Sequence, residues 1–196
     1  MSEAKTLQGG QWVASGGASF TLAGAATREV ADELRADVVA DNVYELSTRG
    51  ADVAGALDAM QQGQKTAAQI LRDVTQAMTD LTVFGLAGHT QNICIASGLA
   101  ATLTPDTIPL LSGALDLSER GEHSSLYANN RAGFSNIPDT RHTRLLFDPQ
   151  TGGGLLAAVP ADQAKTLIEK LHQNGHPDSA IIGHLHKGPT AQVSIA

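Results

Sequence analysis

The segment from Thr79 to Gly98 constrains the fold most. An aspartate, Asp80, stands at its start, small residues and glycines follow, and a glycine closes it. This pattern predicts a helix that runs from Asp80 to Gly98, because glycine just past the last turn is a common helix stop. A carboxylate suits the positive end of a helix, and small side chains let its first turns approach another backbone or a ligand. The carboxylate could also hold a hydrated cation, so Asp80 has a capping and a metal-binding interpretation.

Four short motifs follow one another in the second half of the chain. They are Thr-Asp-Leu-Thr-Val-Phe-Gly-Leu-Ala-Gly-His (79–89), Pro-Leu-Leu-Ser-Gly-Ala (109–114), Asp-Pro-Gln-Thr-Gly-Gly-Gly-Leu-Leu (148–156) and Ala-Ile-Ile-Gly (180–183). In this order and spacing they resemble the signatures of selenophosphate synthetase (selenide, water dikinase), a member of the aminoimidazole ribonucleotide synthetase (PurM-like) superfamily. The resemblance covers about residues 79–196 and points to the C-terminal domain of such a synthetase.

The resemblance, together with strands that alternate with helices, implies an α/β (α+β) fold in which a mixed β-sheet carries helices packed on one face. We expect residues 79–196 to form this PurM-like C-terminal domain. Residues 21–78 are expected to form a helical N-terminal appendage or a remnant of an N-terminal domain. Residues 1–20, rich in glycine and serine, are expected to form a flexible arm.

Hydrophobic periodicity and turn residues place the individual elements. Besides the helix at 80–98, helices are predicted at 27–37, 51–62, 65–78, 108–119 and 161–174. Strands are predicted at 99–104, 145–147, 155–159, 180–186 and 192–195, with another short strand near Trp12 and Val13. The polar segment 121–143 is predicted to be a long loop.

Two aspartates are candidate metal ligands. In the resembling synthetases the aspartate that matches Asp80 coordinates magnesium on the phosphates of ATP, so the resemblance implies Mg²⁺ and ATP as cofactors. Mg²⁺ prefers oxygen ligands and bridges phosphate charge that an acidic protein would repel. Residues 40–44 are similar to a second magnesium-binding segment of the family, which makes Asp41 the other candidate; the alternative for Asp41 is a surface or capping carboxylate. His89 is expected to pack or to position neighbours.

The run from Thr151 to Gly154 is the candidate nucleotide-binding segment. Backbone N–H groups of Thr151, Gly152 and Gly153 could cradle a phosphate. A tight turn between two strands accounts for the glycines equally well. The segment is not a P-loop, because the Gly-Lys-Ser/Thr ending is absent.

Two further sets of side chains leave alternatives open. Arg131, Arg141 and Arg144 in the polar segment could meet phosphate, although solvated surface charge is the simpler interpretation. His184 and His186 alternate along a predicted strand and share a face. They could bind a metal or simply be exposed, since no third ligand is evident.

Composition limits the classes of partner. The chain has 196 residues and a net charge of -7, and this acidic balance argues against nucleic acid as a partner. The single cysteine, Cys94, excludes an intramolecular disulfide, suits a reducing compartment and is expected to be a buried inert thiol. No apolar run approaches the ~20 residues that span a bilayer, and no signal-peptide pattern opens the sequence. We therefore expect a cytoplasmic protein without a membrane partner.

The resemblance implies ATP- and Mg-dependent phosphoryl transfer to selenide, with a small-molecule nucleotide as a partner and catalytic residues that stay unassigned. Two departures bear on this expectation. Val83 stands where the family has a glycine, and the N-terminal arm has Lys5 without the Cys or selenocysteine that the family carries nearby. The isolated chain would then be incomplete. The alternative is a non-catalytic nucleotide-binding or dimerisation module, and either version would form a homodimer or pair with a complete synthetase.

Overall fold

The computed structural model describes residues 5–8, 11–14, 53–150 and 152–196. The strands are β1 (Lys5–Gln8), β2 (Gln11–Ala14), β3 (Met78–Asp80), β4 (Ala100–Leu103), β5 (Leu155–Ala157), β6 (Gly183–His186) and β7 (Val193–Ile195). The α-helices are α2 (Val53–Gln61), α3 (Lys65–Arg72), α4 (Gly85–Ser97), α5 (Ala114–Glu119), α6 (Tyr127–Arg131), α7 (Arg141–Arg144) and α8 (Ala164–Gln173). Short 3-10 helices lie at Pro105–Thr107 and Leu145–Phe147.

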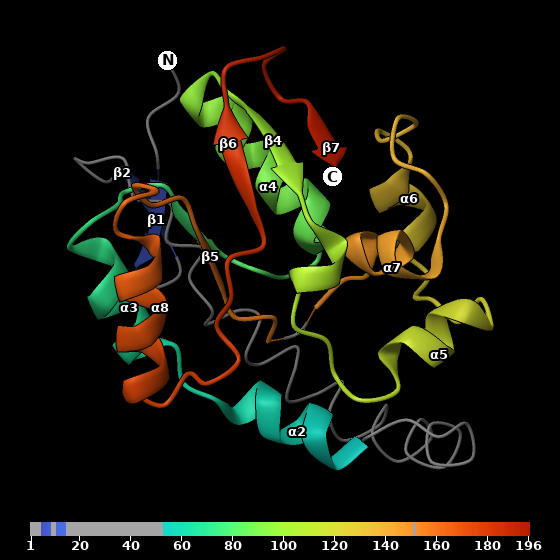
Figure 1. Ribbon diagram of the computed structural model, residues 1–196, viewed down its shortest axis with the longest axis horizontal. Helices are drawn as coiled ribbons and strands as arrows, with labels where there is room; N and C mark the ends of the chain where they lie inside the picture. Colours follow the sequence, from blue (N-terminus) through green and yellow to red (C-terminus); the bar gives the residue numbers. More distant parts are fainter. Residues whose placement is uncertain (1–4, 9–10, 15–52, 151) are drawn as a thin grey trace.

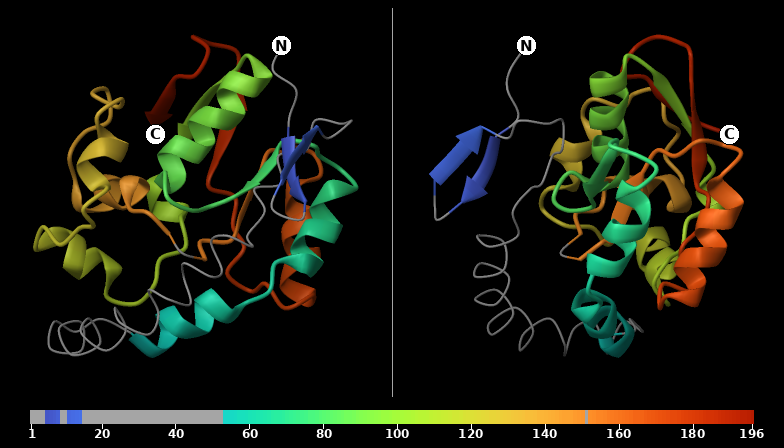
Figure 2. Two further views of the ribbon diagram at one scale, coloured as in Figure 1. Left: turned by 180° about the vertical axis from the view of Figure 1, so that it is seen from behind. Right: turned by 90° about the vertical axis from the view of Figure 1, so that its left-hand side faces the viewer.

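A three-stranded mixed sheet forms one half of the described domain. β4 lies in its centre, antiparallel to β6 and parallel to β7, with Thr102 opposite His184 and Ser194. Ala101 and Leu103 are buried, and Leu103 belongs to the core that α4 closes, whereas Thr102 between them is only half-buried. Figures 1 and 2 show α4 along one side of these strands. Among the described elements, the sheet is thus covered by a helix on one face, as the sequence predicts.

A second, two-stranded sheet forms the other half. β3 and β5 pair antiparallel, and α3 and α8 pack together beside β5 (Figure 1). Apolar residues of α3 recur at three- and four-residue spacing and so meet α8 on one face. The buried members of this smaller core are Ala67, Ile70, Leu71, Leu167 and Leu171.

The main core lies between α4, the three-stranded sheet and the segment that ends at Phe147. Phe134 and Phe147 pack in it with their ring centroids 5.3 Å apart. Its buried members are Leu86, Ala87, Leu103, Phe134, Ile137, Leu146, Phe147 and Val193. The fold class predicted above is therefore assembled from two small cores that are joined through β3, β5 and α4.

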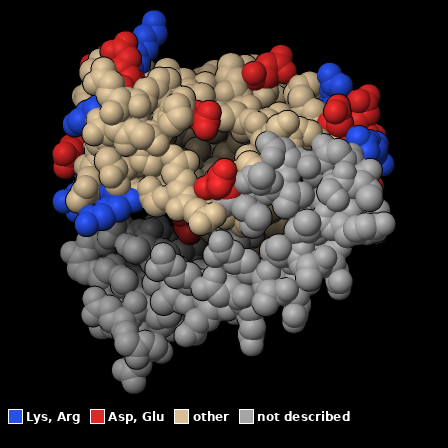
Figure 3. Space-filling view, turned by 90° about the horizontal axis from the view of Figure 1, so that it is seen from below, with Lys and Arg blue, Asp and Glu red and all other residues tan. Residues whose placement is uncertain are grey.

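A groove of about 1000 Å³ separates the α3–α8 pair from the three-stranded sheet. Leu110, Leu111 and Ile181 line it and are exposed. Figure 3 shows the underside of the molecule, where a recess lies among mostly uncharged side chains with acidic side chains beside it, and the other charged side chains lie toward the margins.

The helix predicted from Asp80 to Gly98 starts later than expected. Asp80 is the last residue of β3 and α4 begins at Gly85, so the expected carboxylate at the helix start is wrong. The cause is nonlocal, because the backbone of residues 81–82 is hydrogen-bonded to residues 150–154 and Gly85 then turns the chain with a φ of 66°. The helix end is confirmed: Gly98 is a left-handed cap with a φ of 67°.

Other boundaries are also corrected. The helix predicted at 65–78 ends at Arg72, because Met78–Asp80 pairs with β5. The apolar triplet 145–147 forms a 3-10 helix that buries Leu146 and Phe147, not a strand. The helix predicted at 108–119 begins at Ala114, and the polar loop predicted at 121–143 contains α6 and the start of α7.

The remaining predicted elements are confirmed with shorter ends. They are the strands at 99–104, 155–159, 180–186 and 192–195 and the helices at 51–62 and 161–174. The strand predicted near Trp12 and Val13 is β2, which pairs with β1. The helix predicted at 27–37 lies outside the described residues.

Gly85 and Gly98 give a matched test of the close contact at the start of α4. Both have the same left-handed backbone, but a Cβ at Gly85 would lie 2.7 Å from the Leu146 carbonyl oxygen, whereas a Cβ at Gly98 would meet nothing within 4 Å. We expect Gly98→Ala to cost about 1–2 kcal/mol of unfolding free energy. Gly85→Ala should cost about 1–3 kcal/mol more, because the added methyl group overpacks the core. Urea unfolding measures both, and equal costs would contradict the close packing.

Candidate functional site

Two of the sequence motifs meet where β3 ends. Asp80 pairs in register with Leu155, so the 79–89 motif lies beside the 148–156 motif. The pairing continues past the strands: the Leu81 N–H donates to the Gly154 carbonyl at 2.9 Å, and the Gln150 N–H donates to the Thr82 carbonyl at 3.1 Å. The candidate metal ligand and the candidate phosphate-binding segment, which are 71 positions apart when counted from Asp80 to Thr151, are therefore neighbours in the fold.

The Asp80 side chain is half-buried. No described residue forms a hydrogen bond or an ion pair with its carboxylate, although the Asp80 charge acts on the nearby His89 ring. The described part of the chain holds no cluster of three or more His, Cys, Asp or Glu side chains. Mg²⁺ in nucleotide sites is commonly held by one or two carboxylates, substrate phosphates and water. Asp80 fits one such ligand, and Asp41, the other candidate, lies outside the described residues.

The glycines beside Asp80 allow close packing of the chain on itself. A Cβ at Gly153 would lie 2.9 Å from both Leu81 Cβ and the Leu81 carbonyl oxygen, and one at Gly152 would lie 3.2 Å from Met60 Cα. The Gly153 N–H already donates to the Leu81 carbonyl at 3.2 Å. That group is thus used within the fold, and phosphate contact by Gly152 stays a prediction. Thr151, the third candidate, lies outside the described residues.

His89 holds the loop between β3 and α4. Its side chain is 1% exposed, and its Nε2 accepts a hydrogen bond from the Thr82 N–H at 3.1 Å. Burial lowers the pKa of His89 from its ordinary value of 6.5, while the Asp80 charge acts in the opposite direction. The ring is therefore a neutral acceptor that positions the backbone next to Asp80.

Asp148 is a second carboxylate of these motifs with an altered environment. It is half-buried, and desolvation raises its pKa, while a hydrogen bond from Gln150 Nε2 to Asp148 Oδ2 at 3.3 Å and the charge of His123 oppose that rise. Sequence reasoning did not single out this side chain, because its burial depends on the fold around the 3-10 helix that precedes it.

A family model described as AIR synthase related protein, C-terminal domain, matches residues 19–195. The chain belongs to this family. The match starts before the motifs do, so this AIR synthase related domain includes α2 and α3 as well as residues 79–195.

Several curated relatives of this AIR synthase related domain are named selenide, water dikinase. The Rhizobium meliloti (strain 1021) protein is 37% identical over 126 residues, which cover 61% of this chain and 36% of that protein. The protein of Caldanaerobacter subterraneus subsp. tengcongensis is 31% identical over 137 residues, covering 66% and 40%. The protein of Shewanella sp. (strain W3-18-1) is 39% identical over 122 residues, covering 61% and 34%. The chain thus spans 34–40% of the length of these three relatives.

Among solved structures, that of hydrogenase maturation protein HypE is similar, with a TM-score of 0.40 and 17% identity over 60% of this chain and 32% of that one. No helix in the described residues is long and apolar enough to cross a membrane.

The three arginines of the polar segment are engaged inside the domain. Arg144 forms two hydrogen bonds of 3.0 Å with the Asp139 carboxylate, and Arg141 reaches Glu119 at 3.3 Å. The Arg131 guanidinium lies 5.0 Å from the centroid of the Phe147 ring and donates to the Ile137 carbonyl. These contacts engage each arginine within the described domain, although Arg131 Nη1 is buried without a partner among the described residues, and phosphate contact by the arginines stays a prediction.

The structure also shows the surroundings of the two strand histidines and of the single cysteine. The rings of His184 and His186 lie 5.5 Å apart, and Thr102 Oγ1 lies 3.0 Å from His186 Nε2. Within the described residues no third metal ligand joins these two histidines. Cys94 is fully buried and its pKa is raised by desolvation, so it is protonated and inert at neutral pH.

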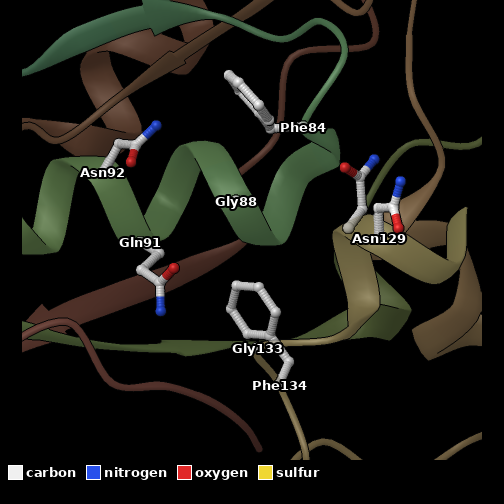
Figure 4. Close-up of a pocket in the computed structure, with 8 residues that line it drawn as sticks. Phe84, Gly88, Gln91, Asn92, Asn129, Gly133 and Phe134 are labelled. Atoms are coloured by element: carbon white, nitrogen blue, oxygen red, sulfur yellow. The ribbon is translucent and has the colours of Figure 1, made fainter. Parts of the chain in front are cut away.

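The loop before α4 presents an exposed aromatic residue. Val83 and Phe84 are 44% and 51% exposed. The Asn130 amide fixes this loop, because its Nδ2 donates to the Val83 carbonyl at 2.8 Å and to the Phe147 carbonyl at 3.0 Å. A pocket of about 270 Å³ lies here between α4 and α6 (Figure 4). The 79–89 motif includes Phe84. No local sequence pattern predicted the pocket, because its lining residues come from two separate helices and the segments beside them.

We expect the stability of the fold to fall on acidification through His89. The lowered pKa means that the neutral ring is favoured in the folded state. The contribution of neutral His89 to the free energy of unfolding is present above the ordinary pKa of 6.5 and is lost as the pH falls through the folded-state pKa. Urea unfolding of the wild type should therefore show a loss of stability from about pH 7.5 to about pH 5 that His89→Leu lacks.

His89→Leu should also cost about 1–3 kcal/mol at neutral pH, because it leaves the Thr82 N–H without its acceptor. His184→Gln removes an exposed imidazole and serves as the control. Since Asp148 titrates in the same molecule, the informative quantity is the difference between wild type and variant at each pH. A difference that does not change with pH would contradict the role given to His89.

Proposed function

We propose that this chain works as the C-terminal domain of a selenide, water dikinase-like phosphotransferase, in which ATP supplies the phosphoryl group and selenide accepts it. The curated relatives carry that name, and the family match places the chain among AIR synthase related C-terminal domains. The observation that carries the proposal is the pairing of β3 with β5, which sets the Asp80 carboxylate, unpaired among the described residues, beside the glycine-rich segment.

In this proposal Asp80 supplies one oxygen ligand to Mg²⁺ on the nucleotide phosphates. When bound, the ion neutralises phosphate charge and orients the transferred group. Within the chain, the hydrogen bond from the Thr82 N–H to neutral His89 holds the backbone next to Asp80, so the carboxylate is positioned before ligands arrive. Catalysis of phosphoryl transfer depends mainly on such positioning and on charge neutralisation.

The second candidate is a non-catalytic nucleotide-binding or dimerisation module. One observation favours it: exposed Leu110, Leu111 and Ile181 line an apolar groove. Exposed apolar patches of this kind mark interaction surfaces in monomeric domains. In this version the domain would pair with a second copy or with a complete synthetase.

We expect calorimetric titration of Mg-ATP to detect binding that Asp80→Asn weakens at least about tenfold, since it removes the negative charge of an oxygen ligand of the metal. Asp162→Asn is the matched control, because Asp162 is exposed and lies before α8, away from the β3–β5 pair. Equal affinity in wild type and Asp80→Asn would remove the proposed metal role.

The two candidate functions differ in turnover. A selenide-dependent conversion of ATP by the chain, alone or mixed with a complete synthetase, would support the enzyme. Binding of Mg-ATP without turnover in either preparation would favour the non-catalytic module.

A further inference from the structure

Two imidazole rings lie side by side on one face of the three-stranded sheet. His184 and His186 are two positions apart on β6, the strand that pairs with β4 (Figure 1), so both side chains leave the same face of the strand. Their ring centroids are 5.5 Å apart. His184 is exposed and His186 is half-buried. The pair belongs to a different sheet from Asp80, so it lies outside the site of the proposed function.

The surroundings of His186 fix the tautomer of its ring. Its Nδ1 lies 3.1 Å from the Lys187 carbonyl oxygen, and a carbonyl oxygen can only accept, so Nδ1 carries the hydrogen. In the neutral ring the other nitrogen, Nε2, then keeps its lone pair. Histidines that bind metals through one nitrogen are commonly oriented by such a hydrogen bond from the other. His186 is thus held in the tautomer that a metal ligand requires.

The lone pair of His186 Nε2 can be released at little cost. Thr102 Oγ1 lies 3.0 Å from that nitrogen and donates its hydrogen to it. The same hydroxyl lies 3.0 Å from Ser194 Oγ, which is a second acceptor because its own hydrogen is donated to the Ala101 carbonyl at 3.1 Å. Thr102 can therefore turn from His186 to Ser194 and keep one hydrogen bond. A cation that takes the Nε2 lone pair leaves the hydroxyl paired.

His184 offers the second nitrogen. No described residue forms a hydrogen bond or an ion pair with its ring, so either of its nitrogens can turn toward a ligand. The described residues bring no third His, Cys, Asp or Glu to this place, and water would fill the remaining positions around an ion. Imidazole suits Zn²⁺ and Cu²⁺, whereas Mg²⁺ prefers oxygen ligands. The two rings therefore favour a late first-row divalent ion.

We propose that His184 and His186 form a binding site for one late first-row divalent ion such as Zn²⁺. Its protein ligands are His186 Nε2 and one ring nitrogen of His184. The ion keeps further coordination positions, which water or an added ligand can occupy. The site goes beyond the proposed function, because it requires neither a nucleotide nor Asp80.

The test is a titration of Zn²⁺ into the full chain carrying ¹⁵N-labelled histidine, followed in spectra of the ring nitrogens. The His186 Nε2 signal should shift in a saturable way, while His186 Nδ1 keeps its hydrogen. His184→Gln and His186→Gln should each weaken Zn²⁺ binding at least about tenfold, because each removes a ligand. His172→Gln, which removes an exposed imidazole from α8, should leave the affinity unchanged. An excess of Mg²⁺ should not displace Zn²⁺.

Ser194 and Thr102 test the release of the Nε2 lone pair, although neither is a ligand. Ser194→Ala removes the acceptor to which the Thr102 hydroxyl turns, so Zn²⁺ should bind about two- to tenfold more weakly, as expected for one hydrogen bond lost on binding. Adding Thr102→Val removes the hydroxyl as well and should restore the wild-type affinity. A merely structural role of these two side chains would not produce this restoration.

Two results would overturn the site. One is a wild-type titration without a saturable shift of the His186 Nε2 signal, and the other is a Zn²⁺ affinity that His184→Gln and His186→Gln leave unchanged. Circular dichroism of each metal-free variant verifies that the fold is kept, and if His186→Gln unfolds the chain, the exposed His184→Gln decides the matter. These titrations contain no ATP, so their result and the effect of Asp80→Asn on Mg-ATP are independent.

Discussion

The pairing of β3 with β5 is the interaction on which the rest of the structure depends. Three register pairs join the strands, and further backbone hydrogen bonds extend the contact to Thr82 and Gln150. This contact links the small core under α3 and α8 to the main core under α4. It also leaves Asp80 at the end of a strand, where no described residue pairs with its carboxylate. One backbone interaction therefore joins the two cores and positions the half-buried candidate ligand.

The loop between β3 and α4 shows how the same residues serve packing and chemistry. Gly85 brings the start of α4 against the backbone of Leu146, and neutral His89 accepts the Thr82 N–H from inside the domain. These contacts face inward, so Val83 and Phe84 face outward. Val83, which stands where the resembling family has a glycine, is 44% exposed.

Local signals in the sequence predicted a large part of the fold. The left-handed Gly98 ended α4 where expected, the apolar face of α3 was evident from its spacing, and β4 and α8 were found near their observed bounds. The errors share one cause. Met78–Asp80 is a strand only because β5 pairs with it, and 145–147 curls into a 3-10 helix because Leu146 and Phe147 must reach the main core.

The same distinction between local sequence signals and nonlocal contacts applies to the candidate site. Asp80 and the glycine-rich segment were predicted from motifs and stay predictions, and the sequence could not tell that the Gly153 N–H donates to the Leu81 carbonyl. The pocket between α4 and α6 was missed because Gln91 and Asn129 lie on different helices. The hydrogen bond from Asn130 Nδ2 to the Val83 carbonyl ties α6 to the loop before α4.

The most direct measurement is paramagnetic broadening by Mn²⁺-ATP, with Mn²⁺ standing in for Mg²⁺, in the backbone amide spectrum of the ¹⁵N-labelled chain. A shared metal-phosphate site at the end of the β3–β5 pair predicts that the signals of Asp80, Leu81, Gly152 and Gly154 broaden together, while those of α8 stay sharp. Broadening that spares either side of the pair, or that occurs elsewhere in the chain, would contradict a site built by bringing the two motifs together.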